Sequence, residues 1–257
     1  MSLWKKIMQA LGVAAADNST VNENLADDVI RAREAAYAQH FGALPADILK
    51  MANLVGRWPG GGIYKIASTG NDGRPRWVYV SSGLANPGIP ALAGENSVTH
   101  DGEGRVAGIH AHLQGDGSFL PANGFGYEIL VIAEEDAEWP LMLLQWAINA
   151  EFSHRLSLLE QVEQYQGVSV GDVATGDGGD ADLLIHKAQA PLPASLHLPN
   201  GEIPLLVITT ITKPELDWSL QHGRDALLQQ LLASPVGQTS FLSRESVLEG
   251  DGEIRPE

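Results

Sequence analysis

The sequence has 257 residues, 44% of them hydrophobic, and contains no cysteine, which excludes a disulfide framework, a cysteine-ligated zinc site and a thiol nucleophile. Sixteen Lys and Arg side chains stand against 32 Asp and Glu side chains, and the net charge of −16 argues against nucleic acid as a partner, because phosphate binding requires clustered cations. The sequence contains no uncharged apolar run long enough for a transmembrane helix, so we expect no membrane insertion.

The N-terminus allows two interpretations. Lys5 and Lys6 precede an apolar stretch over residues 7–16, as in a weak signal peptide. The apolar residues between Leu3 and Leu11 also recur at spacings of three and four, as in a short amphipathic helix. Gln9 and Gly12 interrupt the stretch, which favours the helix, and we expect a cytoplasmic protein.

Two helices are expected next. Apolar residues at helical spacing run from Leu25 to Phe41, and Pro45 begins a shorter pattern that continues to Leu54. Residues 1–55 are therefore expected to form an N-terminal helical segment. Strand-like patterns follow from residue 56, at 64–68, 76–81, around 98, 105–113, 124–133, 183–186 and 205–209.

The run over residues 124–133 is the clearest strand, and its continuous apolar character indicates a central position that is covered on both faces. A helical pattern begins at Trp139 and continues to Val162, either as one helix or as two, and a last one runs from Pro214 to Leu231. The acidic residues 236–257 are expected to be a flexible tail. We predict an α+β fold in which helices cover a mostly antiparallel or mixed sheet, with its domain at 56–235.

Three histidines are candidate metal ligands. His110 and His112 share one face of a predicted strand, and His100 precedes them. Together with a nearby Asp they would suit a metal-dependent hydrolase, which is the enzymatic alternative for this chain. Two ligands on one strand do not make a site, and a polar sheet face is the ordinary explanation. We expect no catalytic residue, metal or cofactor.

Two acidic features also have competing interpretations. Glu128 lies in an otherwise apolar strand, where it is either a general base or ligand contact, or a structural carboxylate bonded to a neighbouring loop or helix turn. No second carboxylate lies at a matching position, so the structural role is favoured. The sequence Asp177-Gly-Gly-Asp180-Ala-Asp182 superficially resembles a calcium loop, but it lacks the ligand spacing and the closing glutamate, which favours a solvated loop.

Four segments together resemble the Suppressor of fused family. In chain order they are WVYVSSGL at 77–84, GFGYEI at 124–129, the helix start Trp139-Pro140, and ITKPEL at 211–216. Their order is that of the family, and they span roughly residues 56 to 232, which is most of the chain. The pairing of GFGYE with a following Trp-Pro is the specific part of the resemblance.

The resemblance implies a non-enzymatic protein-binding domain. The animal member of the family restrains Gli transcription factors, and bacterial members serve largely as immunity proteins against toxins. This chain has Ala85-Asn86 where the family often has a serine and an acidic residue, so the family's ligand contacts do not carry over. About 25 residues follow the last helix, so we expect a single lobe and no Gli-type clamp. The resemblance makes scaffold positions of Trp77, Gly83, Gly124, Gly126, Glu128, Trp139 and Pro140.

We therefore expect a bacterial immunity protein that neutralises a toxin by direct binding, with a chaperone or adaptor for a secreted effector as the alternative. Tyr79 is expected to border a groove where a partner adds a strand to the sheet. An acidic loop is expected to steer a basic toxin domain toward the protein, through Glu134, Glu135, Asp136 and Glu138. The sequence predicts no oligomeric state.

Overall fold

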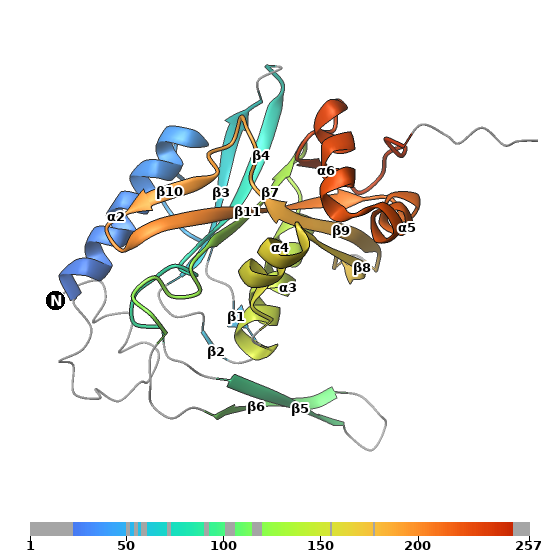
Figure 1. Ribbon diagram of the computed structural model, residues 1–257. Coiled ribbons are helices and arrows are strands. Elements are labelled where there is room, and N and C mark those ends of the chain that lie inside the picture. Colours follow the sequence, from blue (N-terminus) through green and yellow to red (C-terminus); the bar gives the residue numbers. More distant parts are fainter. Residues whose placement is uncertain are drawn as a thin grey trace, which may run out of the picture.

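The computed structural model describes residues 23–49, 52–53, 56–57, 61–70, 73–89, 93–100, 106–114, 120–154, 156–176 and 178–248. Figure 1 shows a central sheet flanked by helices, together with two separate two-stranded ribbons. The α+β class expected from the sequence is confirmed. Residues 1–16, with their two alternatives, lie outside the described residues, and none of the described helices is long and apolar enough to cross a membrane.

Helices form where apolar residues recur at spacings of three and four. They are α2 (Glu23–His40), α3 (Trp139–His154), α4 (Leu158–Tyr165), α5 (Lys213–His222) and α6 (Arg224–Ala233). The helix expected from Leu25 is confirmed as α2. The long pattern from Trp139 forms two helices, α3 and α4. The last pattern is also divided, because Gly223 has a φ of 100° and ends α5.

Most of the strands occur where alternation or apolar runs predicted them. They are β1 (Ala52–Asn53), β2 (Gly56–Arg57), β3 (Gly62–Thr69), β4 (Pro75–Ser82), β5 (Ala93–His100), β6 (Val106–Gln114), β7 (Glu128–Ala133), β8 (Val168–Ala174), β9 (Asp180–Lys187), β10 (Ser195–Leu198), β11 (Gly201–Ile211) and β12 (Thr239–Ser240). The short helix expected after Pro45 is wrong over residues 45–49. There Leu49 instead exchanges two backbone hydrogen bonds with Ile63 and extends the edge of β3.

The main sheet has the strand order β3-β4-β7-β11-β9-β8. β7 and β11 run parallel, whereas the other neighbours along this order are antiparallel, so the sheet is mixed. All six residues of β7 are buried, which confirms the central position expected for this strand. β10 folds back on β11 as a hairpin, and β12 pairs with β7 in parallel.

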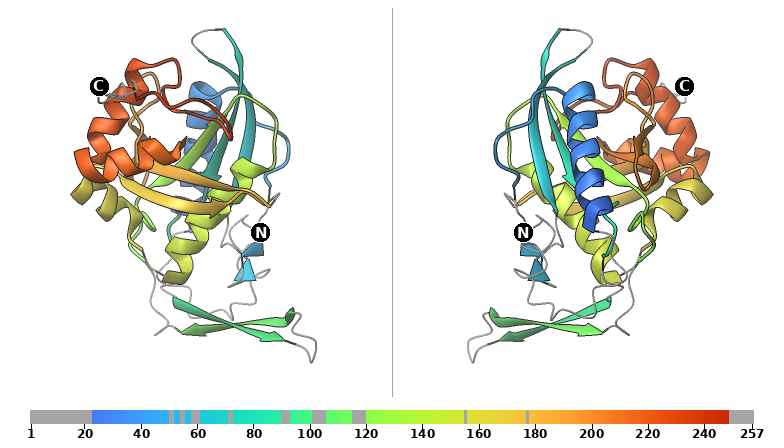
Figure 2. Two further views of the ribbon diagram at one scale, coloured as in Figure 1. Left: turned by 90° about the vertical axis from the view of Figure 1, so that its right-hand side faces the viewer. Right: turned by 90° about the vertical axis from the view of Figure 1, so that its left-hand side faces the viewer.

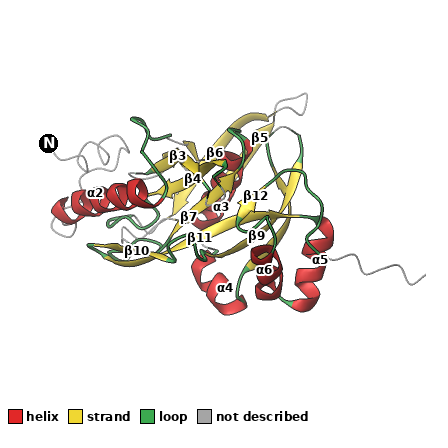
Figure 3. Cartoon of the chain, turned by 90° about the horizontal axis from the view of Figure 1, so that it is seen from above, coloured by secondary structure: helices red, strands yellow, loops and turns green. Residues whose placement is uncertain are grey.

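Alternate residues of the central strands pack on opposite faces of the sheet. In β7, Ile129 and Val131 belong to the core under α3 and α4, whereas Leu130 and Ile132 belong to the core under α2. A third apolar cluster joins Leu184 of β9 to α5 and α6. Figure 2 shows α2 lying across β3 and β4, and Figure 3 shows α2 and the α5–α6 pair toward opposite ends of the sheet. The N-terminal segment 1–55 therefore contributes α2 to the same core as the rest of the domain.

Residues 236–248 also belong to the folded body, which corrects the flexible tail expected there. β12 pairs with Ile132 and Ala133 of β7, at the end of the β7–β11 pairing. The Ser240 hydroxyl donates to the Ile208 carbonyl oxygen, at 3.1 Å, and accepts from the Thr210 N–H, at 3.0 Å. These bonds engage backbone groups at the end of the β7–β11 pairing, which explains why a polar segment is held there.

Gly124 allows two loops to approach each other closely. Its φ is +60°, and a Cβ atom at this position would lie 2.4 Å from the Leu84 carbonyl oxygen and 2.8 Å from that of Asn86. The Phe125 N–H donates to the same Leu84 oxygen, at 2.8 Å. The backbone of the 83–89 loop therefore packs directly on the segment that leads into β7.

Replacing Gly124 with Ala is expected to destabilise the protein by about 3–5 kcal/mol, because the left-handed backbone and the backbone clash both add cost. Gly73 provides a matched control, since its φ is +76° and nothing lies within 4 Å of the point that a Cβ atom would occupy there. Gly73→Ala should cost about 1 kcal/mol. Denaturant-induced unfolding of both variants measures the difference, and equal losses would contradict the close approach at Gly124.

His186 is buried in β9 with both ring nitrogens hydrogen-bonded. Its Nδ1 lies 2.9 Å from the Lys187 carbonyl oxygen and its Nε2 lies 3.0 Å from the Thr209 hydroxyl. Because a carbonyl oxygen only accepts, Nδ1 carries the proton and Nε2 accepts from Thr209, as in a neutral ring. Burial lowers the pKa of His186 from 6.5 to about 4.

The unfolded chain binds a proton at His186 below pH 6.5, whereas the folded protein does so only near pH 4, so His186 makes stability fall as the pH drops. Between pH 7 and pH 5 this should remove about 2 kcal/mol of unfolding free energy. His186→Gln should flatten this part of the profile, measured by chemical unfolding. The exposed His197, changed to Gln in the same way, controls for loss of a histidine, and an unchanged profile in His186→Gln would disprove the assignment.

Candidate functional site

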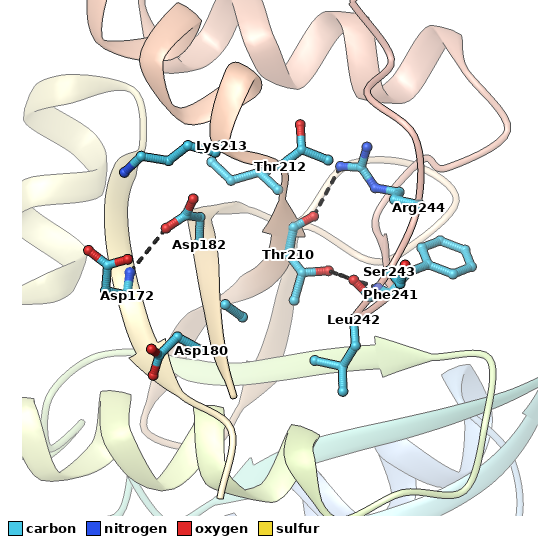
Figure 4. A pocket seen from close by; sticks show the side chains of 12 residues that line it. Asp172, Asp180, Asp182, Thr210, Thr212, Lys213, Phe241, Leu242, Ser243 and Arg244 are labelled. Atoms are coloured by element: carbon cyan, nitrogen blue, oxygen red, sulfur yellow. Dashed lines mark hydrogen bonds between the residues drawn. The ribbon is translucent and has the colours of Figure 1, made fainter. Parts of the chain in front are cut away.

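A pocket of about 380 Å³ opens where β8, β9 and β11 meet the start of α5 and residues 241–244. Asp172, Asp180 and Asp182 line one side of it (Figure 4). Arg244 lies across the pocket from these carboxylates, and Thr210 of β11 lies between them. The pocket thus has three carboxylates on one side and the Arg244 guanidinium on the other.

A bulge in β8 places the first of these carboxylates. The pairing of β8 with β9 shifts between Val170 and Val173, and Asp172 within the bulge has a φ of 58°. The Asp172 N–H donates to Asp182 Oδ1, at 3.0 Å, which holds the two residues together across the strands. The bulge thus places Asp172 at the edge of the pocket (Figure 4).

The opposite wall is built by the chain after β12. The Thr210 hydroxyl donates to the Phe241 carbonyl oxygen and accepts from the Phe241 N–H, both at 2.8 Å. Arg244 donates to the Thr210 carbonyl oxygen at 3.2 Å and reaches both carboxylate oxygens of Glu215 at 2.6 Å. The C-terminal segment is thereby fixed to β11 and to the first turn of α5.

Glu215 is the residue that neutralises Arg244. Burial alone would raise the pKa of Glu215, but hydrogen bonds from Arg244 and from the N–H groups of Thr212 and Val247 outweigh burial and hold it below its ordinary value. Thr212 and Glu215 also form a capping box that starts α5. Arg244 therefore contributes little net charge to the pocket.

Unlike Arg244, the other charged groups of the pocket are not neutralised by a salt bridge in the part of the chain that the structure describes. Within the described ranges, no salt bridge involves Asp172, Asp180, Asp182 or Lys213. Lys213 lies on the carboxylate side of the pocket (Figure 4). Three carboxylates and one ammonium leave the pocket with a net negative charge.

Tyr79 does not border a groove, which corrects that expectation. Its side chain is fully buried in the core under α3. Its hydroxyl donates to the Ala137 carbonyl oxygen at 2.8 Å and accepts from the Ala137 N–H at 3.0 Å. Tyr79 thus anchors the loop before α3, and a partner has no access to its side chain.

The acidic loop is exposed, but two of its four carboxylates are already paired. Glu134 lies 3.1 Å from Arg76 of β4, and Asp136 forms a salt bridge with Lys65 of β3. Glu135 accepts a long hydrogen bond of 3.5 Å from the Trp139 ring nitrogen. None of the four residues, including Glu138, lines the pocket. The cations of the β3–β4 hairpin therefore weaken the negative field of this loop.

The three histidines lie on the ribbon formed by β5 and β6. In the backbone register His110 is opposite Ser97, His112 is opposite Glu95, and His100 is opposite Val106. Their side chains lie outside the described part of the structure. Among the described residues, no group of three His, Asp or Glu side chains could hold a metal ion.

Glu128 forms a buried polar centre with Arg33 of α2. Its Oε1 accepts from Arg33 Nη1 at 3.0 Å and from the Gly83 N–H at 2.8 Å, and its Oε2 accepts from the Ser81 hydroxyl at 2.5 Å. Arg33 also donates to Ser82 and Asn86. These are the contacts of a structural carboxylate bonded to a neighbouring loop, and both charged side chains are inaccessible to solvent.

The remaining motif residues lie around this centre or in the core under α3. Gly83 and Gly126 have φ values of 137° and 83°. Trp139 is buried in the core at the start of α3, with Pro140 beside it, and Trp77 packs against the same core from β4. Lys65 lies over the Trp77 ring, 4.9 Å from its centre.

The sequence patterns do not predict the pocket. They place Asp180 and Asp182 in a solvated loop, although both residues lie in β9. No sequence pattern marks Lys213 or Arg244 as a residue of the pocket. One signal is present, since Thr212 followed by Glu215 three residues later is the pattern of a capping box. A buried glutamate at that position requires a cation, and Arg244 supplies it.

The chain matches the model of the family described as Suppressor of fused protein (SUFU) over residues 62–245. It is similar to "the Sufu-Fu complex crystal structure", with 17% identity and a TM-score of 0.50, over 87% of this chain and 92% of that one. It is also similar to the "Crystal structure of Drosophila Suppressor of Fused", with 16% identity and a TM-score of 0.49, over 86% of this chain and 50% of that one. The chain thus spans half the length of the Drosophila protein. A search of curated proteins found no match.

Replacing Glu128 with Gln should destabilise the protein by about 3–5 kcal/mol, because it leaves Arg33 as a buried, unpaired cation. Glu151 offers a matched control. It is also buried and accepts from Tyr127 and from the N–H groups of Ser157 and Leu158, with no arginine among these donors. Glu151→Gln should therefore cost about 1–2 kcal/mol. Chemical unfolding compares the variants, and a milder effect at Glu128 than at Glu151 would contradict this account.

Proposed function

Because the chain belongs to the Suppressor of fused family over residues 62–245, we propose that it is a non-enzymatic protein-binding module whose partner presents a basic surface. A similar fold occurs in a structure that is titled as a complex of Sufu with Fu, which supports binding to another protein. The observation that carries the choice of partner is the pocket, whose three carboxylates have no salt bridge within the described residues.

The charge of the whole chain supports the same partner. A net charge of −16 raises the rate of encounter with a basic protein and disfavours nucleic acid. Steering by this field speeds association more than it tightens the final complex, so the on-rate should depend strongly on salt. The loop from Glu134 to Glu138 contributes less than its four carboxylates suggest, because Arg76 and Lys65 neutralise two of them.

The specific role we propose is that of a bacterial immunity protein, which binds a toxin domain in the cytoplasm and covers its active surface. Many toxins that act on nucleic acids are basic, because they must bind phosphate, and an acidic protein competes for the same surface. Such a role requires no catalysis by this chain, in agreement with the family's character as a binding domain.

Affinity capture with the full-length chain from a lysate of its own source organism tests this proposal. We expect one stoichiometric basic protein that binds at low salt and is released as the salt concentration rises. That protein, expressed alone, should arrest growth, and co-expression with this chain should restore growth. A captured protein that is harmless would contradict the immunity role while leaving protein binding supported. Failure to capture any partner at low salt would contradict protein binding itself.

A further inference from the structure

We propose that the β5–β6 ribbon binds a zinc ion through Glu95, His110 and His112, which the strand register brings to one face of the ribbon. The site lies outside the pocket and goes beyond the proposed function, because it requires no partner protein. It also goes beyond the expectation of no metal drawn from the sequence, since the register adds a ligand from a second strand.

Two of the three ligands come from β6. His110 and His112 are separated by one residue, so the alternation of an extended strand places both on the same face. Residues two apart along a strand are spaced about 7 Å, which is close enough for both to serve one ion. The neutral imidazole is among the ligands that zinc prefers in proteins. Two histidines on one strand still leave the site incomplete.

The third ligand is Glu95 of the neighbouring strand. It is paired directly opposite His112, and Ser97 is paired opposite His110. Directly opposite residues of an antiparallel pair share a face, with their Cβ atoms about 5 Å apart. Glu95 is therefore the direct cross-strand neighbour of His112 and a diagonal neighbour of His110. Two histidines and one glutamate are a known ligand set for zinc, which leaves the fourth tetrahedral position open.

The register also separates polar from apolar residues of the ribbon. The face of the proposed ligands carries further polar residues, namely Ser97, Thr99 and Gln114. The other face carries the larger apolar residues of the two strands, namely Val98, Ile109, Ala111 and Leu113. The residues suited to a core therefore do not share a face with His110 and His112. In the described ranges, β5 and β6 pair only with each other, so the ribbon has two open edges (Figure 1).

His100 does not belong to this ligand set. It follows Glu95 by five residues in β5, so alternation places it on the opposite face. The pairing of the strands also shifts between Thr99 and His100. Of the three histidines singled out in the sequence, the register thus retains two and replaces the third with Glu95. The net charge of −16 favours a cation at this site.

Calorimetric titration of zinc chloride into the full-length chain, purified without a histidine tag and stripped with a chelator, tests the site. We expect a single zinc ion per chain, with a micromolar dissociation constant. His110→Ala, His112→Ala and Glu95→Gln should each weaken binding by about tenfold or more, because even groups that only support a metal ligand contribute that much to affinity. His100→Ala removes a histidine from the same ribbon and should leave the affinity unchanged.

Nuclear magnetic resonance of the wild-type chain gives a second measurement that does not depend on the folding of any variant. Zinc should shift the imidazole resonances of His110 and His112 at one equivalent and leave those of His100 in place. Absence of stoichiometric binding would overturn the inference. Equal weakening by His100→Ala and His112→Ala would also overturn it, because it indicates unspecific binding to surface histidines. An unchanged affinity in Glu95→Gln would do the same, since the register adds that ligand.

Failure of the zinc site is distinguishable from failure of the proposed function. The double variant His110→Ala/His112→Ala should capture the same basic partner from lysate as the wild type, because the site is separate from the pocket. Capture of a partner by a chain that binds no zinc would refute the zinc site and leave protein binding intact. Stoichiometric zinc binding without any captured partner would support the site and contradict the function proposed above.

Discussion

The salt bridge between Arg33 and Glu128 joins segments that lie far apart in the sequence. Arg33 comes from α2, Glu128 opens the central strand, and the 83–85 backbone lies between them and donates to the same carboxylate. Two charges without access to water are stable only when each finds partners, so the helix, the loop and the strand must be placed together. Tyr37 extends the arrangement, because its hydroxyl donates to the Ser81 carbonyl oxygen. The face of the sheet that α2 covers is organised by this centre.

A second ion pair joins separate segments of the chain at the other end of the sheet. Glu215 caps α5, and Arg244 reaches it from the last described segment of the chain. In both cases a buried glutamate lies in a short family motif, and its arginine lies outside that motif. The motifs therefore contain the two buried acceptors, while the arginines that pair with them come from segments outside the motifs.

The parts of this fold that were predictable from the sequence are those with a strong local period or an unbroken apolar run. The helix from Leu25, the central strand ending at Ala133 and the mixed sheet belong to this group. The strand β12 was not predictable, because two polar residues carry no periodicity and their place depends on backbone groups of β11. The pocket was missed for a related reason, since its carboxylates and its cations meet only through tertiary contacts. Tyr79 was misjudged because a tyrosine in a strand pattern gives no indication of which face is covered.

The position of β12 has a consequence for the order in which the protein can be completed during synthesis. Residues 239–248 come last among the described residues, yet they lie beside the central strand and form one wall of the pocket. A nascent chain that has reached only residue 235 already contains every strand of the sheet except this one. Its carboxylates are present, but the wall opposite them is not. The pocket is therefore complete only after the ribosome has added these residues.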